Sequence, residues 1–202
     1  MENNGKLGCV VMAAGNARRF GQNKLAASLD GRSLIRRTLE SIPAQQFERV
    51  VVVTQYPEIA ELVKSFRFTV IYNDHPDHGI SHTIKLGLTA LGNCGGAMFV
   101  VSDQPLLRKD TVAALAKLWK EQPERITALG HNGVRGNPCV FPARFFPELM
   151  ALTEDHGGST VIRRHEEDLL LLETEAGELT DVDTPEAMEH LKAALLGGDR
   201  SI

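Results

Sequence analysis

Strand-like and helix-like segments alternate along this chain at intervals of about 25 to 30 residues. Short apolar runs, some of them rich in β-branched residues, predict strands at 8–13, 49–54, 68–72, 97–101, 126–130, 138–141 and 169–173. Apolar residues at helical spacing predict helices at 34–42, 57–65, 80–91, 112–119, 144–152 and 158–165. Because helices that connect successive strands make crossovers between parallel strands, this order predicts an α/β fold with a mainly parallel sheet flanked by helices.

The starts of three helices carry recognisable signals. The helix at 80–91 should begin near Ser81, and Asp110 should cap the helix at 112–119. Thr184 should cap a last helix, with Pro185 at its first position.

A chain of 202 residues with 43% hydrophobic content can bury a core, and no Pro-, Gly- or Ser-rich linker divides it. We therefore expect a single domain over 1–202, with a core at about 7–196 and a frayed tail at 197–202.

Composition excludes several classes of function. A net charge of −4 argues against a general nucleic-acid binder, and no apolar run reaches the roughly 20 residues of a membrane span. Residues 1–8 do not resemble a secretory signal. The three cysteines lie far apart in no paired motif, which argues against disulfides and a zinc site. We expect a cytoplasmic protein with no nucleic-acid or membrane partner.

Positive charge is concentrated near the start of the chain. Residues 1–37 carry a local balance of +5, although the whole chain is acidic. Such an arrangement predicts an anionic ligand near this end, and chance clustering is the alternative.

The segment 13–24 follows the first predicted strand and has the composition of an anion-binding loop. Gly15 directly after a buried strand lets the backbone turn and present its N–H groups, and Arg19 and Lys24 add positive charge. Neither the dinucleotide-binding GxGxxG pattern nor the P-loop pattern fits this segment. The pattern predicts a polyphosphate ligand, against the alternative of an ordinary loop with surface Arg and Lys.

Acidic residues follow at two further points where ligands of parallel sheets bind. Asp103 comes straight after the strand at 97–101 and could hold Mg²⁺ beside a polyphosphate, or it could simply form a turn. Asp181 and Asp183 point the same way if their segment is extended. One of them could complete the metal site, or both could merely lead into the last helix.

Three histidines stand between the third strand and the following helix. His75, His78 and His82 have spacings that resemble those of zinc ligands, but Pro76 and Gly79 interrupt the first interval and no cysteine lies near. The segment is better interpreted as a substrate loop that runs into a helix N-terminus, which favours anions.

Taken together, these segments resemble a known family. The opening loop resembles the Ala-Ala-Gly-x-Ser-x-Arg-Phe-Gly-x-x-Lys signature of MobA-like nucleotidyltransferases, and the chain is most similar to the molybdenum cofactor cytidylyltransferases within them. The other matching motifs are Asp103-Gln104-Pro105, Arg135-Gly136-Asn137-Pro138, Phe146-Pro147-Glu148-Leu149 and Asp181-Val182-Asp183-Thr184-Pro185-Glu186. The resemblance extends from Gly8 to about Leu195.

The resemblance implies a Rossmann-like nucleotidyltransferase domain with a twisted sheet that uses Mg²⁺ and CTP. It implies catalytic roles for Arg19 and Lys24 on the phosphates and for Asp103 on the metal, with Asp183 near the metal. The residues expected to contact the nucleotide are Met12, Ala13, Ala14, Gly15, Arg19, Lys24, Asn73, Ser81 and Asp103. The implied acceptor is a molybdopterin-type phosphate, and a molybdenum hydroxylase would receive the product.

Some residues depart from the family pattern. Ala17 replaces the usual loop serine, Asn137 stands where His is commoner, and His82-Thr83 replaces small serines. The last two lie where we expect the acceptor, so they leave its identity open. The Ala14 methyl group occupies room that a purine needs, which predicts CTP rather than GTP as the substrate.

The expected reaction is in-line attack of the acceptor's terminal phosphate on the α-phosphorus of CTP, with release of pyrophosphate. A phosphate monoester is already ionised near neutral pH, so no general base is needed. Two other readings remain open. One is a transferase that uses GTP or that acts on a sugar phosphate or small phospho-acid. The other is a non-catalytic nucleotide-binding accessory protein for a molybdenum enzyme.

Overall fold

The strands of the main sheet lie in the order β5-β4-β1-β6-β8-β7-β9, so the first strand of the chain is near its centre. A computed structural model describes residues 5–15 and 23–196. The strands of this sheet are β1 (Leu7–Ala13), β4 (Arg49–Thr54), β5 (Thr69–Tyr72), β6 (Gly96–Val101), β7 (Ile126–His131), β8 (Val134–Pro142) and β9 (Leu169–Glu173). The tail expected at 197–202 lies outside the described residues.

Most neighbouring strands are parallel, as the alternating pattern predicts. β1 pairs in parallel with β4 and β6, β4 with β5, and β7 with β9. β8 runs antiparallel to both of its neighbours, β6 and β7. It is also longer than the strand expected at 138–141, because an Asn132-Gly133 turn with positive φ at both residues (50° and 77°) folds β7 and β8 into a hairpin.

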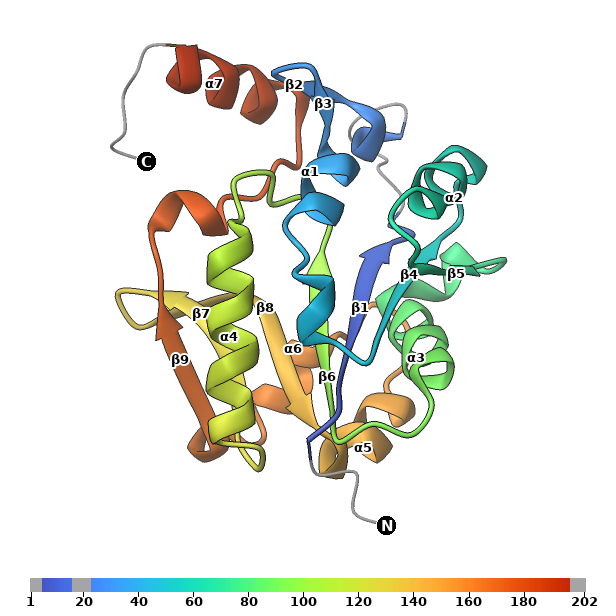
Figure 1. Ribbon diagram of the computed structural model, residues 1–202, viewed down its shortest axis with the longest axis vertical. Coiled ribbons are helices and arrows are strands. Elements are labelled where there is room, and N and C mark those ends of the chain that lie inside the picture. Colours follow the sequence, from blue (N-terminus) through green and yellow to red (C-terminus); the bar gives the residue numbers. More distant parts are fainter. Residues whose placement is uncertain (1–4, 16–22, 197–202) are drawn as a thin grey trace.

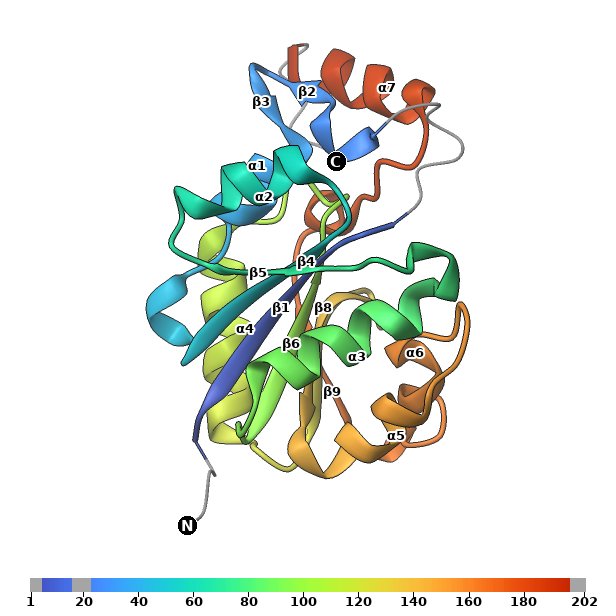
Figure 2. The ribbon, with the colours of Figure 1, turned by 90° about the vertical axis from the view of Figure 1, so that its right-hand side faces the viewer.

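Helices cover both faces of the sheet (Figures 1 and 2). One layer contains α1 (Leu34–Glu40), α2 (Pro57–Lys64) and α4 (Lys109–Glu121), and the other contains α3 (Gly79–Leu91), α5 (Phe146–Ala151) and α6 (Gly158–Ile162). Because side chains alternate along a strand, Cys9 and Val11 of β1 pack under the first layer and Val10 under the second. The result is the expected single α/β domain.

Close approach of α3 to the central strand depends on a residue without a side chain. A Cβ at Gly87 would lie 2.4 Å from the Val10 side chain, so only glycine lets the helix pack this near to β1. The helix begins at Gly79, two residues before the expected Ser81. Its position matters because its first turn lies beside the cavity described below.

The cap expected for α4 is wrong. Helix α4 begins at Lys109, so Asp110 lies inside the first turn rather than before it. The buried Glu178 carboxylate from a distant segment takes the capping role by accepting a hydrogen bond from the Arg108 N–H (2.9 Å). Thr184 does cap the last helix, α7 (Pro185–Leu196), through a bond from the Ala187 N–H to its hydroxyl (3.1 Å).

A small two-stranded hairpin of β2 (Ser28–Leu29) and β3 (Arg32–Ser33) packs against α7 (Figure 2). Leu29 and Leu34 share a small buried cluster there with Val182, Met188 and Leu191. This cluster fixes both chain segments that approach the carboxyl end of β1. Within 5–15 and 23–196, no helix is both long and apolar enough to cross a membrane.

Candidate active site

A cavity of about 510 Å³ lies at the carboxyl ends of β1 and β6. Separate segments of the chain line it: Met12, Ala14, Gly15, Lys24, Leu25, Pro76, Asp77, Gly79, Ile80, Thr83, Val101, Ser102, Asp103, Asp155 and Asp183. This is the sheet edge at which ligands of parallel α/β folds bind. Three segments therefore meet here, as expected: the loop after β1, the end of β6 and the acidic segment before α7.

Lys24 joins the two acidic segments. Its ammonium lies 2.9 Å from Asp103 Oδ2 and 2.9 Å from Asp183 Oδ1. Lys24 begins a short 3₁₀ turn (Lys24–Ala26) that the Asn23 side chain caps by accepting from the Leu25 N–H. Two carboxylates thus converge on one positive centre.

The acidic pair is held together by the main chain as well. The Val182 N–H donates to the Asp103 carbonyl (2.8 Å), and the Val182 side chain is fully buried. This bond ties the 181–184 segment to the end of β6. Asp183 faces the cavity, whereas Asp181 is not among its lining residues. Of the two aspartates between which the sequence could not choose, the structure brings Asp183 to Lys24.

The electrostatics of the cluster favour a bound cation. Burial alone lowers the pKa of Lys24, but the attraction of Asp103 and Asp183 outweighs it, so the pKa is raised and the ammonium stays charged. Desolvation and the nearby Asp103 carboxylate raise the pKa of Asp181. Two carboxylates, Asp103 and Asp183, thus face one lysine, and the carboxyl group of Asp181 lies close to them.

The first loop contributes backbone and small side chains. Ala14 and Gly15 line the cavity, whereas the Ala13 side chain is buried in the core. The Tyr56 hydroxyl donates to the Gly15 carbonyl (3.0 Å), and the Ser102 hydroxyl donates to the Met12 carbonyl (2.9 Å). These bonds fix the strand end on which a nucleotide would lie. Arg19, expected on the phosphates, lies outside the described residues.

Asn73 and Ser81 are buried and are not among the residues that line the cavity. The Asn73 amide donates to the Thr83 hydroxyl (3.2 Å), and its carbonyl accepts from the His75 N–H (3.0 Å). Ser81 is buried, and its backbone N–H donates to the Glu154 carbonyl (3.1 Å). Both residues thus make contacts that hold the loop 75–80, and Thr83, the partner of Asn73, lines the cavity; their predicted contact with a nucleotide stays a prediction.

Sequence reasoning missed two acidic residues of the lining, Asp77 and Asp155. A Cβ on Gly79 would lie 2.4 Å from the Glu154 carbonyl oxygen and 2.7 Å from Asp155 Oδ1, so the loop carrying Asp155 packs directly on the start of α3. Asp77 does lie in the segment that the sequence predicts to be a substrate loop. No local signal could place Asp155 here, because its position depends on contact between segments about 75 residues apart. Ser102 could have been noticed, since it immediately precedes Asp103.

A second cavity of about 200 Å³ adjoins the first and shares Met12, Ile80 and Val101 with it. Its walls are mostly apolar, with Arg135 and Asn137 as the polar groups from β8. The Arg135 guanidinium contacts the Gly136 carbonyl (3.3 Å) and the Cys139 sulfur (3.4 Å). A molecule bound in this smaller cavity would lie next to one bound in the larger.

The chain is similar to known proteins over most of its length. The model of the MobA-like NTP transferase domain family matches residues 9–169. The purine catabolism protein PucB of Bacillus subtilis (strain 168) is 27% identical over 199 residues, which cover 92% of this chain and 96% of the relative. A 2-C-methyl-D-erythritol 4-phosphate cytidylyltransferase of Dehalococcoides mccartyi (strain CBDB1) is 30% identical over 115 residues, which cover 54% of this chain and 51% of that relative.

Among solved structures, a nucleotidyl transferase from Methanothermobacter thermautotroptrophicus superimposes with a TM-score of 0.79 at 18% identity, over 96% of this chain and 99% of the other. This likeness bears out the fold. The family match spans the first loop, Lys24, Asp103 and the strands that position them. The chain therefore belongs to the MobA-like NTP transferase domain family, and it is a nucleotidyltransferase.

Proposed function

We propose that this protein transfers CMP from CTP to the terminal phosphate of a molybdopterin-type acceptor and releases pyrophosphate. The observation that carries the proposal is the convergence of Asp103 and Asp183 on the Lys24 ammonium, each at 2.9 Å, inside a cavity at the carboxyl ends of β1 and β6. A phosphate chain and its counter-cation need this combination of one fixed positive charge and paired carboxylates.

Asp103 and Asp183 are the residues that would hold Mg²⁺. They fit this role because both carboxylates already point at one cation and because Mg²⁺ prefers one or two carboxylates together with phosphate oxygens. When bound, the ion would neutralise negative charge that develops on the phosphates. Lys24 would then turn its ammonium from the carboxylates to the phosphates, a movement that its long side chain allows.

The preference for CTP rests on the space that one side chain of the first loop leaves for the base. The Ala14 side chain lies at the cavity wall, where a purine would meet its methyl group. A pocket that discriminates by size alone separates two bases by about 1–3 kcal/mol, so GTP should be a poor but measurable substrate. The cytidylyltransferase name of one relative supports the same base.

The second cavity is where we place the acceptor. It opens onto the first through shared residues, and Arg135 supplies a cation beside apolar walls. The acceptor's terminal phosphate is ionised without help from a base. One of its oxygens forms a bond to the α-phosphorus of CTP while the bond from that phosphorus to the oxygen of the β-phosphate breaks. The β- and γ-phosphates leave together as pyrophosphate. The chain's residues position the two groups and balance their charge.

The test is pyrophosphate release from CTP or GTP, with Mg²⁺, in the presence and absence of molybdopterin. We expect release with CTP and acceptor together, and loss of it in Asp103→Asn. Asp110→Asn, which changes an exposed aspartate away from the cavity, should behave as wild type. Equal turnover with GTP would refute the choice of base. Nucleotide binding without any release would favour the non-catalytic accessory role, and release only with a sugar phosphate or phospho-acid would change the acceptor.

On this proposal, the product passes to a molybdenum hydroxylase in the cytoplasm. The location is supported by the cysteines, because Cys9, Cys94 and Cys139 are all buried free thiols. Co-purification of such an enzyme with the chain, dependent on the bound product, would check the transfer.

A further inference from the structure

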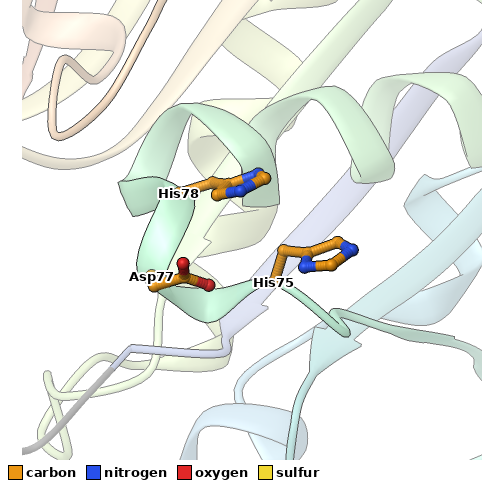
Figure 3. Close-up of side chains that lie close together, drawn as sticks. All are labelled: His75, Asp77 and His78. Carbon is orange, nitrogen blue, oxygen red and sulfur yellow. The ribbon is translucent and has the colours of Figure 1, made fainter.

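His75, Asp77 and His78 lie close together (Figure 3), and Asp77 also lines the large cavity. One ligand atom from each of the three lies within 4.8 Å of the others, and all three side chains are exposed. The two imidazole rings stack with their centroids 4.8 Å apart, and the ring of His82 packs edge-on against that of His78 at 5.3 Å.

Local backbone geometry explains why these rings meet. Residues Pro76–His78 form a 3₁₀ turn, closed by a bond from the His78 N–H to the His75 carbonyl (3.1 Å). Side chains three apart eclipse one another in such a turn, which places His75 over His78. Gly79, with a φ of 77°, then starts helix α3, so that His78, directly before the helix, stands four residues from His82 in its first turn. The Pro and Gly that interrupt the histidine spacing are thus the residues that assemble the cluster.

We propose that His75, Asp77 and His78 bind a divalent transition-metal ion of the zinc type. Two imidazoles and one carboxylate are ligands that zinc accepts, and an ion held by three protein groups keeps a position open for water or a substrate oxygen. The exposed side chains can close the remaining distance by rotation. Asp77 also lines the large cavity, so the ion would lie at its edge and fix the turn that forms this wall.

The ligand atoms of this cluster are not committed elsewhere. Among the residues that the structure describes, no hydrogen bond or ion pair engages the ring nitrogens of His75 and His78 or the Asp77 carboxylate. A second carboxylate, Asp155, lies beside Gly79 and adds negative charge near the turn. A cation at this point would therefore displace no existing partner.

A comparable cluster of His165, Glu167 and Asp168 shows the contrast. There, His165 Nε2 already contacts Glu148 Oε1 at 2.7 Å, and Asp168 Oδ1 pairs with Arg144 at 2.8 Å. A metal would have to break both contacts. The cluster at 75–78 also differs from Asp103 and Asp183, whose oxygen-only donors suit Mg²⁺. The three clusters thus differ in what they offer a cation: uncommitted imidazoles and a carboxylate at 75–78, groups that are already paired at 165–168, and carboxylates alone at Asp103 and Asp183.

The experiment is calorimetric titration of the tag-free chain with zinc chloride in a buffer that contains excess Mg²⁺. We expect one zinc per wild-type chain. His78→Ala should lower the affinity for zinc by at least about tenfold, because removing a residue that only supports a metal ligand already costs about 10–100-fold. His75→Ala/His78→Ala should abolish binding, while the matched control His165→Ala should bind as wild type. Cobalt in place of zinc should give visible absorption that His78→Ala removes.

Three outcomes would overturn the proposal. The wild-type chain could bind no zinc, His75→Ala/His78→Ala could bind it as tightly as wild type, or Asp103→Asn could remove the binding and so assign it to the carboxylate pair. Unfolding curves of His78→Ala and His75→Ala/His78→Ala in EDTA should match wild type, because His75 and His78 are exposed. The readout is metal binding, so failure of CMP transfer would leave this result unaffected.

Discussion

The Lys24 ammonium occupies the point at which Asp103 and Asp183 converge, 2.9 Å from an oxygen of each. The Lys24 side chain is 16% exposed and that of Asp103 is 23% exposed, so water screens their charges only in part. Removing the lysine would leave two carboxylates facing each other, with Asp181 nearby. Lys24 therefore has a structural role before any nucleotide arrives.

Lys24→Met should test this role in the free protein. We expect the free energy of unfolding in EDTA to fall by about 1–2 kcal/mol, between the values for exposed and for buried ion pairs. Mg²⁺ should restore more stability to the variant than it adds to wild type, because the ion then fills the position of the lost ammonium. Urea unfolding with EDTA or MgCl₂ measures both effects.

Lys117→Met is the matched control, since Lys117 is exposed and lies 3.8 Å from Glu121 on a solvated helix face. It should change stability by less than about 0.5 kcal/mol and should leave the response to Mg²⁺ unchanged. An equal gain from Mg²⁺ in Lys24→Met and wild type would show that the ion does not compete for the position of the lysine.

Individual residues were predicted for the site where they stand in a loop that follows a parallel strand. Lys24 and Asp103 could be chosen because βα loops of a parallel sheet meet at one edge. The choice between Asp181 and Asp183 could not be made, because it depends on the direction in which the Val182 backbone crosses the end of β6. Asn73 follows β5 and Ser81 lies in the first turn of α3; neither is among the residues that line the cavity, and contacts with Thr83 and with the distant Glu154 loop hold them in place.

At the scale of elements, one buried carboxylate holds three segments together. Glu178 is 3% exposed and accepts from the Arg108 N–H and Nε, from the Thr111 hydroxyl (3.0 Å) and from the Thr174 hydroxyl (2.8 Å). These donors belong to the start of α4 and to the end of β9. Glu178 thereby anchors the chain shortly before it reaches Asp183.

Glu178→Gln should therefore destabilise the domain by about 2–3 kcal/mol. The amide replaces one acceptor oxygen by a donor, so a bond from Arg108 or from a threonine is lost and the Arg108 charge loses its buried partner. Chemical denaturation gives the value. Glu175→Gln is the control, because exposed Glu175 contacts the same Arg108 at 3.4 Å and should cost less than about 0.5 kcal/mol. Equal costs would mean that burial of Glu178 adds nothing.

The elements themselves were largely predictable, and the exceptions have identifiable causes. Alternation of strands and helices gave the parallel part of the sheet, since each crossover is local in sequence. The antiparallel strand β8 was expected to be shorter, although Asn132-Gly133 carried the signal for a tight hairpin. The cap of α4 could not be found locally, because Glu178 lies about 70 residues further along the chain.

For the whole molecule, the cavity draws its walls from segments far apart in the sequence, from Met12 to Asp183. A ligand that bridges these walls binds the folded chain only, because unfolding separates them. It must then stabilise the entire domain by mass action, by an amount that depends on its concentration relative to its Kd. Global stability thus reports on which nucleotide the cavity accepts.

CTP with Mg²⁺ should raise the unfolding temperature of the full chain. At a concentration 100 times its Kd, the ligand adds about 2.7 kcal/mol, which corresponds to roughly 5–11 °C for a domain of this size. GTP at the same concentration should give a smaller shift because of the Ala14 methyl group, and EDTA should reduce the shift with CTP. Asp103→Asn should remove the dependence on Mg²⁺, since it takes away one of the two carboxylates that face Lys24. Calorimetry of the four combinations measures these shifts, and identical shifts for CTP and GTP with or without Mg²⁺ would contradict both the base preference and the assignment of the carboxylate pair.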